Sequence, residues 1–387
     1  MSAERTPPNP LRQRDVRRFL REYWQSKPLL VRGAVPGIES LLSPDELAGL
    51  ALEPEVESRM VLDRGGSKPS ELRNGPFSEA DFASLPDSHW SLLVQAVDQW
   101  VPQVHALRER FAFLPGWRFD DIMISYASDQ GGVGPHFDHY DVFLIQACGR
   151  KRWRIGAACG QDTPCRSDTE LRILKHFDTR EEYVLEPGDM LYIPTGVAHW
   201  GIALGECMTW SVGFRAPSHA DIISEVAAVA AARSADELRY TDAGMALVRD
   251  GEIPEQAVRQ LQRVLRGVAD DANLVREWFG RFVTERKYPE LDAPGVRVRG
   301  DLRAWLRTGG FLQRNPAARF AWTAVPDCTL YVDGECWACE ERLARLLCGS
   351  AALDAASLVP LLRGRAARTL LDILVARGVL YRQRDRG

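Results

Sequence analysis

The sequence has no apolar run long enough to span a membrane or to act as a secretion signal, either in its first thirty residues or later. It has no strong excess of one charge, since 49 lysines and arginines face 53 aspartates and glutamates for a net charge of −4. Its eight cysteines are scattered along 387 residues and do not form the dense framework of a disulfide-rich secreted domain. We therefore expect a cytoplasmic protein with reduced thiols, and no direct binding to membranes or nucleic acid.

The first part of the chain mixes helical and extended patterns. Apolar residues at helical spacing predict a helix over 16–24, and a serine followed by acidic residues predicts a second helix over 44–51. A third helix is predicted over 88–100, and a short strand over 29–31. Between about 117 and 215 the pattern changes to short apolar runs separated by turns with Gly and Pro, which is typical of a closed or double-sheet β-structure.

The remainder of the chain reverts to helices. Between 218 and about 290, three segments carry apolar residues at three- and four-residue spacing, and Pro289 and Pro294 predict a linker behind them. The last ninety residues combine helices with one hairpin that turns at Asp333-Gly334, an order that is typical of a winged-helix module. The sequence thus predicts an α+β protein with a β domain over 1–217, a helical domain over 218–292 and a winged-helix domain over 293–387.

Two motifs in the β region carry the chemistry of a metal site. In GVGPHFDHYD, His136 and Asp138 are two residues apart, so on a strand their side chains share one face. The run PGDMLYIPTGVAHW contains two turns around a strand and then supplies His199. Two histidines and one carboxylate on one face of iron(II) leave open positions for a co-substrate and O2. All three residues are therefore candidate metal ligands, although an isolated HxD pair is more often solvated surface.

Together, HFD, PGDMLYIPTGVAH and the strand GRKRW resemble the Jumonji branch of the cupin-type oxygenases. The resemblance implies a double-stranded β-helix with the site in the barrel mouth, and it implies Fe(II), the co-substrate 2-oxoglutarate and O2. The distal carboxylate of 2-oxoglutarate needs a cation. With Trp153 in the interior, strand alternation places Lys151 on the same side, and the family carries its carboxylate-binding Lys or Arg at the matching position. Lys151 is our candidate; an exposed basic edge strand is the alternative.

A closer resemblance, to the bacterial ribosomal oxygenases, covers the first 217 residues and, more loosely, the rest. It rests on segments such as FLREYWQSKPLLVRG, WSLLVQAVDQW, DDIMISYA, GGVGPHFDHYDVFLIQACGRKRWRIG and SVGFRAP. The resemblance implies hydroxylation of the β-carbon of one arginine in the sixteenth protein of the large ribosomal subunit. It also implies Asp121 and Ser211 as partners of the guanidinium, with Met123 and Tyr140 beside the methylene stem.

Two of these assignments leave alternatives open. Asp121 shares one face of its strand with Met123 and Ser125, but it can also be an exposed acid at the strand end. Where the family places a small hydroxyl residue near the distal carboxylate of 2-oxoglutarate, the sequence reads Tyr126-Ala127-Ser128. That departure leaves Ser125 as the candidate for the second contact to the co-substrate.

The C-terminal modules carry weaker signals. The resemblance implies that the helices between about 218 and 290 pair two protomers in a homodimer, although their apolar stripes can also pack within one chain. The winged-helix segment mixes arginines with a strongly apolar face, so protein contact or simple support is favoured over DNA binding. Cys336 and Cys339 form a single CxxC without a second pair or a nearby histidine, so a zinc site is not favoured, although Cys328 and Cys348 leave it open.

Two other kinds of function are compatible with the same residues. A ribosomal protein histidine hydroxylase or an N-methyl-lysine demethylase would use the same iron centre on a different side chain. A metal-binding cupin or winged-helix regulator without turnover would need no cation for a co-substrate, so Lys151 argues for catalysis.

Overall fold

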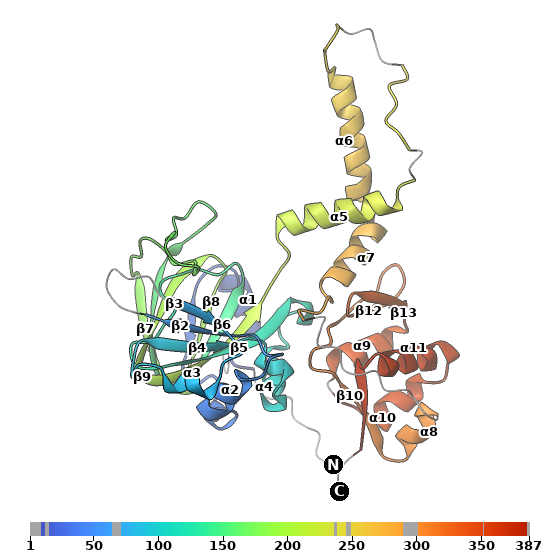
Figure 1. Cartoon of the computed structure of the whole chain (residues 1–387). Helices are drawn as coiled ribbons and strands as arrows, with labels where there is room; N and C mark the ends of the chain where they lie inside the picture. Colours follow the sequence, from blue (N-terminus) through green and yellow to red (C-terminus); the bar gives the residue numbers. More distant parts are fainter. Residues whose placement is uncertain are drawn as a thin grey trace. The chain divides into compact units, whose positions relative to one another are not determined.

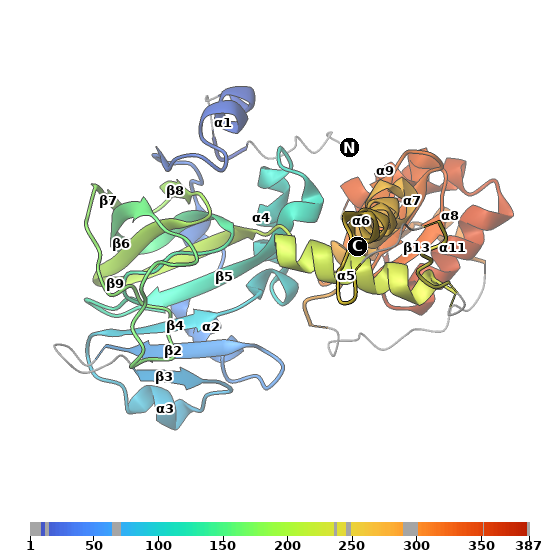
Figure 2. The same cartoon turned by 90° about the horizontal axis from the view of Figure 1, so that it is seen from above.

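The computed structural model describes residues 9–11, 15–63, 71–235, 238–244, 249–288, 301–350 and 352–384. The chain divides into two compact units, Met1–Ala216 and Pro217–Gly387. Figures 1 and 2 show their elements from two directions. The linker predicted at Pro289 and Pro294 lies outside the described residues, and the three-domain division stays a prediction.

The N-terminal unit is built on one antiparallel sheet of nine strands. Its order is β1-β8-β6-β9-β5-β4-β2-β3, and β7 pairs with β6 beside this path. The strands are β1 (Leu29–Val31), β2 (Ser58–Leu62), β3 (Glu71–Asn74), β4 (Trp90–Val94), β5 (Phe119–Ala127), β6 (Asp141–Ala158), β7 (Glu181–Leu185), β8 (Met190–Ile193) and β9 (Val197–Phe214). The helices of this unit are α1 (Val16–Glu22), α2 (Pro44–Leu50), α3 (Glu79–Ala83) and α4 (Pro102–Leu107).

The two longest strands, β6 and β9, fold this sheet into a barrel. Their pairing shifts register between residues 146 and 150 and again between 155 and 158. The first half of β6 lies between β8 and the end of β9, whereas its second half lies between β7 and the start of β9. Apolar side chains of both halves, such as Leu144 and Trp153, belong to one buried cluster. The two halves therefore face each other, and the predicted double-stranded β-helix is confirmed.

Helices cover the outer face of the sheet. Phe19 of α1 packs against Phe143 of β6 and Tyr192 of β8, with ring centroids 5.8 and 5.1 Å apart. Leu47 of α2 and Leu107 of α4 belong to the same core. Burying each such side chain contributes roughly 2 kcal/mol. The predicted helices over 16–24 and 44–51 and the strand over 29–31 are confirmed, the first helix ending at Glu22.

The helix predicted over 88–100 is wrong. Trp90–Val94 forms β4, which pairs with β2 on one side and β5 on the other. Ala96 then takes a left-handed conformation with φ of 50°, which ends any regular element before a short 3-10 turn over Val97–Gln99. Pairing inside the sheet has overridden the helical spacing of the apolar residues.

The C-terminal unit begins with three helices, as predicted, and continues with two small sheets among short helices. The hairpin of β12 (Thr329–Val332) and β13 (Glu335–Ala338) turns at Asp333 and Gly334, whose φ angles of 48° and 78° are those of a tight hairpin turn. The helices are α5 (His219–Arg233), α6 (Glu255–Asp270), α7 (Ala272–Phe282), α8 (Leu302–Arg307), α9 (Glu341–Gly349), α10 (Ala355–Leu358) and α11 (Arg365–Ala376). The strands are β10 (Gly310–Arg314), β11 (Phe320–Thr323), β12 (Thr329–Val332), β13 (Glu335–Ala338), β14 (Ala352–Leu353) and β15 (Leu380–Arg384).

Within this unit α7 packs on the hairpin, whereas α6 extends away from it (Figure 1). Arg281 of α7 donates to the carbonyl oxygen of Gly334 at 3.0 Å, and its Nη2 lies 3.1 Å from Sγ of Cys336. α6 carries large apolar side chains that are exposed: Ile253 just before it, then Val258, Leu261, Val264 and Leu265. No helix among the described residues is both long and apolar enough to cross a membrane.

Candidate iron and co-substrate site

Backbone hydrogen bonds join the two predicted metal-binding motifs. The amide of His136 donates to the carbonyl of His199 at 3.0 Å, and the amide of His199 donates back at 2.8 Å. Contrary to expectation, HFD does not lie on a regular strand, because His136 forms only an isolated bridge and Asp138 lies in the loop that follows. The carbonyl of Asp138 accepts from the amide of Gly196 at 2.8 Å, in the turn that leads into β9. Hydrogen bonds to β9 and to the turn before it thus fix the position of the loop that carries His136 and Asp138.

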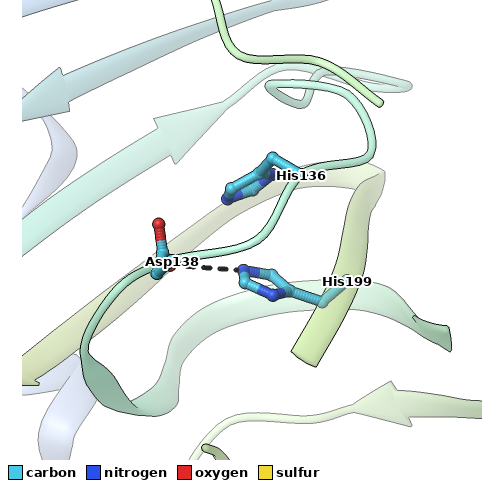
Figure 3. Close-up of side chains that lie close together, drawn as sticks. All are labelled: His136, Asp138 and His199. Carbon is cyan, nitrogen blue, oxygen red and sulfur yellow. Dashed lines mark ion pairs between the residues drawn. The ribbon is translucent and has the colours of Figure 1, made fainter. Parts of the chain in front are cut away.

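This bridge brings the three predicted ligands together (Figure 3). One ligand atom from each of His136, Asp138 and His199 lies within 4.8 Å of the others. Nε2 of His199 is 3.5 Å from Oδ2 of Asp138, and the two imidazole rings are 4.3 Å apart between centroids. Across the described ranges this is the one group of three such residues at that spacing.

The hydrogen bonds of the two imidazoles fit a metal ion at this point. Nδ1 of His136 lies 2.9 Å from the carbonyl oxygen of Gly134, and Nδ1 of His199 lies 2.9 Å from that of Val197. A carbonyl oxygen only accepts, so each Nδ1 carries the proton and each Nε2 keeps its lone pair. Metal-bound histidines are typically oriented in this way. The donor set therefore suits iron(II), with one carboxylate and two imidazole nitrogens.

Burial prepares His199 further. The residue is 2% exposed. This burial, followed by the neighbouring His136, lowers the pKa of His199 to about 4. The imidazole is thus neutral at pH 7, and a metal ion meets no competing proton there.

Lys151 points into the barrel from the second half of β6. It is 6% exposed, and its Nζ lies 5.1 Å from the ring centroid of Trp153. Burial lowers the pKa of its ammonium, and no carboxylate among the described residues acts on it. By contrast, Arg152 and Arg154 face outward and pair with Glu182 at 3.4 and 3.2 Å. The predicted alternation is therefore present in the structure.

Gly201 of β9 makes room for this lysine. It lies opposite Trp153 in the strand pairing, two residues after His199. A Cβ atom at Gly201 would come within 2.8 Å of the Trp153 ring and 2.9 Å of Cε of Lys151. Because Gly201 has no side chain, Lys151 can lie against β9, the strand that carries His199.

The predicted substrate residues converge on the same interior from β5 and β9. Met123 is paired with Ser211 and Ser125 with Thr209, so their side chains share one face of the sheet. Asp121, on that same face of β5, is 4% exposed and not the exposed strand-end acid of the alternative interpretation. Burial, followed by the charges of Asp138 and Asp121, raises the pKa of the Tyr140 phenol. Tyr140 packs against the buried cluster of the barrel interior that contains Leu144 and Trp153.

Sequence reasoning missed other polar residues of the interior. Thr209 of β9 donates from Oγ1 to Oε1 of Gln146 of β6 at 3.1 Å, and both are buried. Strand alternation from Leu144 could have found Gln146. No sequence signal indicated Gln95, which lies before the 3-10 turn and donates from Nε2 to Oδ2 of Asp121 at 2.6 Å.

Comparison with known proteins decides the family. The family model described as a JmjC domain matches residues 106–222, and the ROXA-like winged helix matches residues 267–381. Ribosomal protein uL16 3-hydroxylase of Escherichia coli K12 is 38% identical over 275 residues, which cover 71% of this chain and 72% of that protein. The chain belongs to the JmjC ribosomal oxygenases. A probable ribosomal oxygenase of Haemophilus influenzae is 33% identical over 82% of this chain and 80% of its own.

Solved structures agree with this membership. The structure of the E. coli ribosomal oxygenase YcfD matches with a TM-score of 0.85 and 32% identity, over 96% of this chain and 98% of that one. A structure of the same protein with cobalt and 2-oxoglutarate has a TM-score of 0.85 at 32% identity, over 96% and 99% of the two chains. This chain accordingly uses iron(II), 2-oxoglutarate and O2. Its predicted winged-helix module is confirmed.

Proposed function

We propose that this oxygenase hydroxylates the β-carbon of one arginine in ribosomal protein uL16. The observation that carries the proposal is the shared barrel interior of a metal-binding triad, a buried lysine and a buried aspartate. The lysine suits an anionic co-substrate, and the aspartate suits a cationic side chain. The E. coli relative named uL16 3-hydroxylase supports the choice of protein and of carbon atom.

His136, Asp138 and His199 would hold the iron. Bound iron(II) with 2-oxoglutarate and O2 supplies an oxidant able to replace a C–H bond by C–OH. The Nδ1 contacts of both histidines fix the ring orientations, so the ion would be held at one place relative to the substrate. Lys151 would bind the distal carboxylate of 2-oxoglutarate, and the ion pair would compensate the burial of its charge.

Ser125 is our proposed second contact to that carboxylate. The residue is 7% exposed, and its hydroxyl lies 3.4 Å from the carbonyl oxygen of Thr209, a contact long enough to exchange for a stronger acceptor.

The substrate side chain would lie along β5 and β9. Asp121 and Ser211 would receive the guanidinium, while Met123 and Tyr140 would line the methylene stem. A neutral imidazole gains no ion pair from a buried carboxylate, which favours arginine over the histidine of the alternative function.

Mass spectrometry tests the activity. The protein is incubated with iron(II), ascorbate, 2-oxoglutarate and a uL16 peptide around the target arginine. We expect the gain of one oxygen atom on that arginine, and no gain with Asp138→Ala. Oxygen on histidine, or loss of a methyl group from lysine, would establish one of the alternative oxygenase functions. Consumption of 2-oxoglutarate without any peptide change would keep the iron chemistry and reject this substrate.

Three further points complete the proposal. A homodimer would cover the exposed apolar residues of α6 with the same residues of a second copy. A ribosomal protein as substrate supports a cytoplasmic location for the enzyme, which its sequence also predicts. We propose no direct contact with nucleic acid.

A further inference from the structure

The carboxylate of Asp121 accepts hydrogen bonds from the segment that connects β4 to the 3-10 turn. Gln95 donates from Nε2 to Oδ2 of Asp121 at 2.6 Å, and the amide of Ala96 donates to the same oxygen at 3.2 Å. Asp121 itself lies where the pairing of β5 with β9 shifts register between Phe119 and Ile122. A bulge of this kind re-aims side chains, so the aspartate depends on these donors for its orientation.

The orientation of the Gln95 amide is itself determined. Its Oε1 accepts from Nη2 of Arg59, on β2, at 3.3 Å. Its backbone amide donates to the carbonyl of Glu57 at 2.9 Å, which fixes the start of the side chain. Because Arg59 only donates, Oε1 must face it and Nε2 must face Asp121. A relay thus runs from Arg59 through Gln95 to the carboxylate.

A second buried carboxylate makes this relay more important. Asp98 is 3% exposed and accepts from the amide of Ile122 at 2.8 Å, one residue after Asp121. Burial, followed by the charge of Asp121, raises the pKa of Asp98, and Arg108 acts in the opposite direction. The hydrogen bonds from Gln95 and Ala96 thus orient the carboxylate of Asp121 in a region that contains a second buried acid.

We propose that Gln95 is a positioning residue that sets the preference of this oxygenase for an arginine side chain. It does so by fixing the orientation of the Asp121 carboxylate, to which it donates a hydrogen bond, and it has no direct role in binding the substrate or the metal. The inference rests on the proposed function, because it concerns the same substrate subsite. Hydrogen bonds to a charged group are among the stronger ones, so losing this contact should be visible in substrate binding.

The test replaces Gln95 by methionine, which keeps the length and removes the donor. Gln99→Met is the matched control, since Gln99 lies in the 3-10 turn that follows Gln95 and its buried Oε1 has no hydrogen-bond partner among the described residues. Both variants and the unchanged enzyme are assayed with two uL16 peptides, one with arginine and one with neutral citrulline at the target. For Gln95→Met we expect KM for the arginine peptide to rise roughly tenfold, with kcat nearly constant.

The comparison of peptides separates positioning from general damage. The ratio of KM for citrulline to KM for arginine should fall about tenfold in Gln95→Met and stay unchanged in Gln99→Met. Turnover of 2-oxoglutarate without peptide should be equal in all three proteins. Arg59→Met should also lower this ratio, but by a smaller factor than Gln95→Met. It is the variant to test if Gln95→Met folds poorly.

An unchanged ratio in both Gln95→Met and Arg59→Met would overturn the inference while the unchanged enzyme still hydroxylates the arginine peptide. A fall of the ratio in Gln99→Met as large as in Gln95→Met would overturn it as well. If the unchanged enzyme hydroxylates neither peptide, the proposed function fails, and the inference fails with it.

Discussion

Lys151 combines two properties that rarely occur together in a folded protein. Its ammonium is buried over the ring of Trp153, yet no carboxylate of the described chain compensates it. Burial of an uncompensated charge costs stability. An anionic ligand that binds Lys151 compensates this buried charge. We therefore expect 2-oxoglutarate to stabilise the folded protein through this residue.

Lys151→Met should therefore separate stability from function. Without ligand, we expect the variant to be more stable than the unchanged protein, by about 1–3 kcal/mol, because a buried charge is replaced by an apolar side chain of similar length. Thermal unfolding with manganese(II), with and without 2-oxoglutarate, provides the measurement. The unchanged protein should gain stability from 2-oxoglutarate and the variant should not. An equal gain in both would remove Lys151 from the co-substrate site.

Asp98 should make stability depend on pH. Its pKa is raised to about 7, first by burial and then by Asp121, from an ordinary value of 3.8. Between these two values the folded state binds more protons than the unfolded state, so the free energy of unfolding falls as pH rises from about 4 to 7. Asp98→Asn cannot titrate. The difference in free energy of unfolding between Asp98→Asn and the unchanged protein should therefore shift in favour of the variant by up to a few kcal/mol between pH 5 and pH 8.

Denaturant unfolding at several pH values measures this difference. Asp87→Asn is a suitable control, since Asp87 is an exposed aspartate. Parallel stability curves for the unchanged protein and Asp98→Asn would contradict the assignment of the titration to Asp98.

The site residues differ in how far the sequence could predict them. His136, Asp138 and His199 follow from two short motifs, and Lys151 follows from the alternation of one strand. Gln95 and Asp98 could not be found in this way. They meet Asp121 only because β4 lies next to β5 in the sheet, and strand order is a long-range property that local patterns do not contain.

At the scale of elements, turns were predicted better than boundaries. The hairpin at Asp333-Gly334 was clear because two residues of positive φ suit that turn. The strand β4 was mistaken for a helix because its apolar residues satisfy both periods, and only pairing with β2 and β5 decides between them. The bends of β6 and β9 are register shifts that leave no distinct signal in the sequence.

Gly201→Ala should perturb the contact between β6 and β9. The added Cβ would lie 2.8 Å from the ring of Trp153, so the indole must move and Lys151 must move with it. We expect a loss of stability of about 1–3 kcal/mol and a higher KM for 2-oxoglutarate. Gly160→Ala is the control, because no atom lies within 4 Å of the Cβ position there. Steady-state kinetics with varied 2-oxoglutarate would contradict this account if KM were unchanged.

At the scale of the whole molecule, the exposed apolar side chains of α6 should determine the oligomeric state. Leu261 and Leu265 are 53% and 70% exposed. Leu261→Glu with Leu265→Glu places charges on this surface, so we expect a dimer to become a monomer in sedimentation experiments. Gln262→Glu on the same helix adds a charge at a residue that is already polar and should leave the dimer intact. A monomeric unchanged protein would remove the homodimer from the proposal.

The reciprocal backbone bonds between His136 and His199 have a further consequence for the life of this protein in a cell. Because main-chain hydrogen bonds of the protein itself join the two motifs, we expect folding and iron loading to be separate events. Iron starvation should then leave an intact, silent pool of enzyme. Restored iron would activate this enzyme within the time that metal uptake takes, without new protein synthesis. The extent of ribosomal protein hydroxylation would then reflect the iron supply at the time each ribosome was assembled.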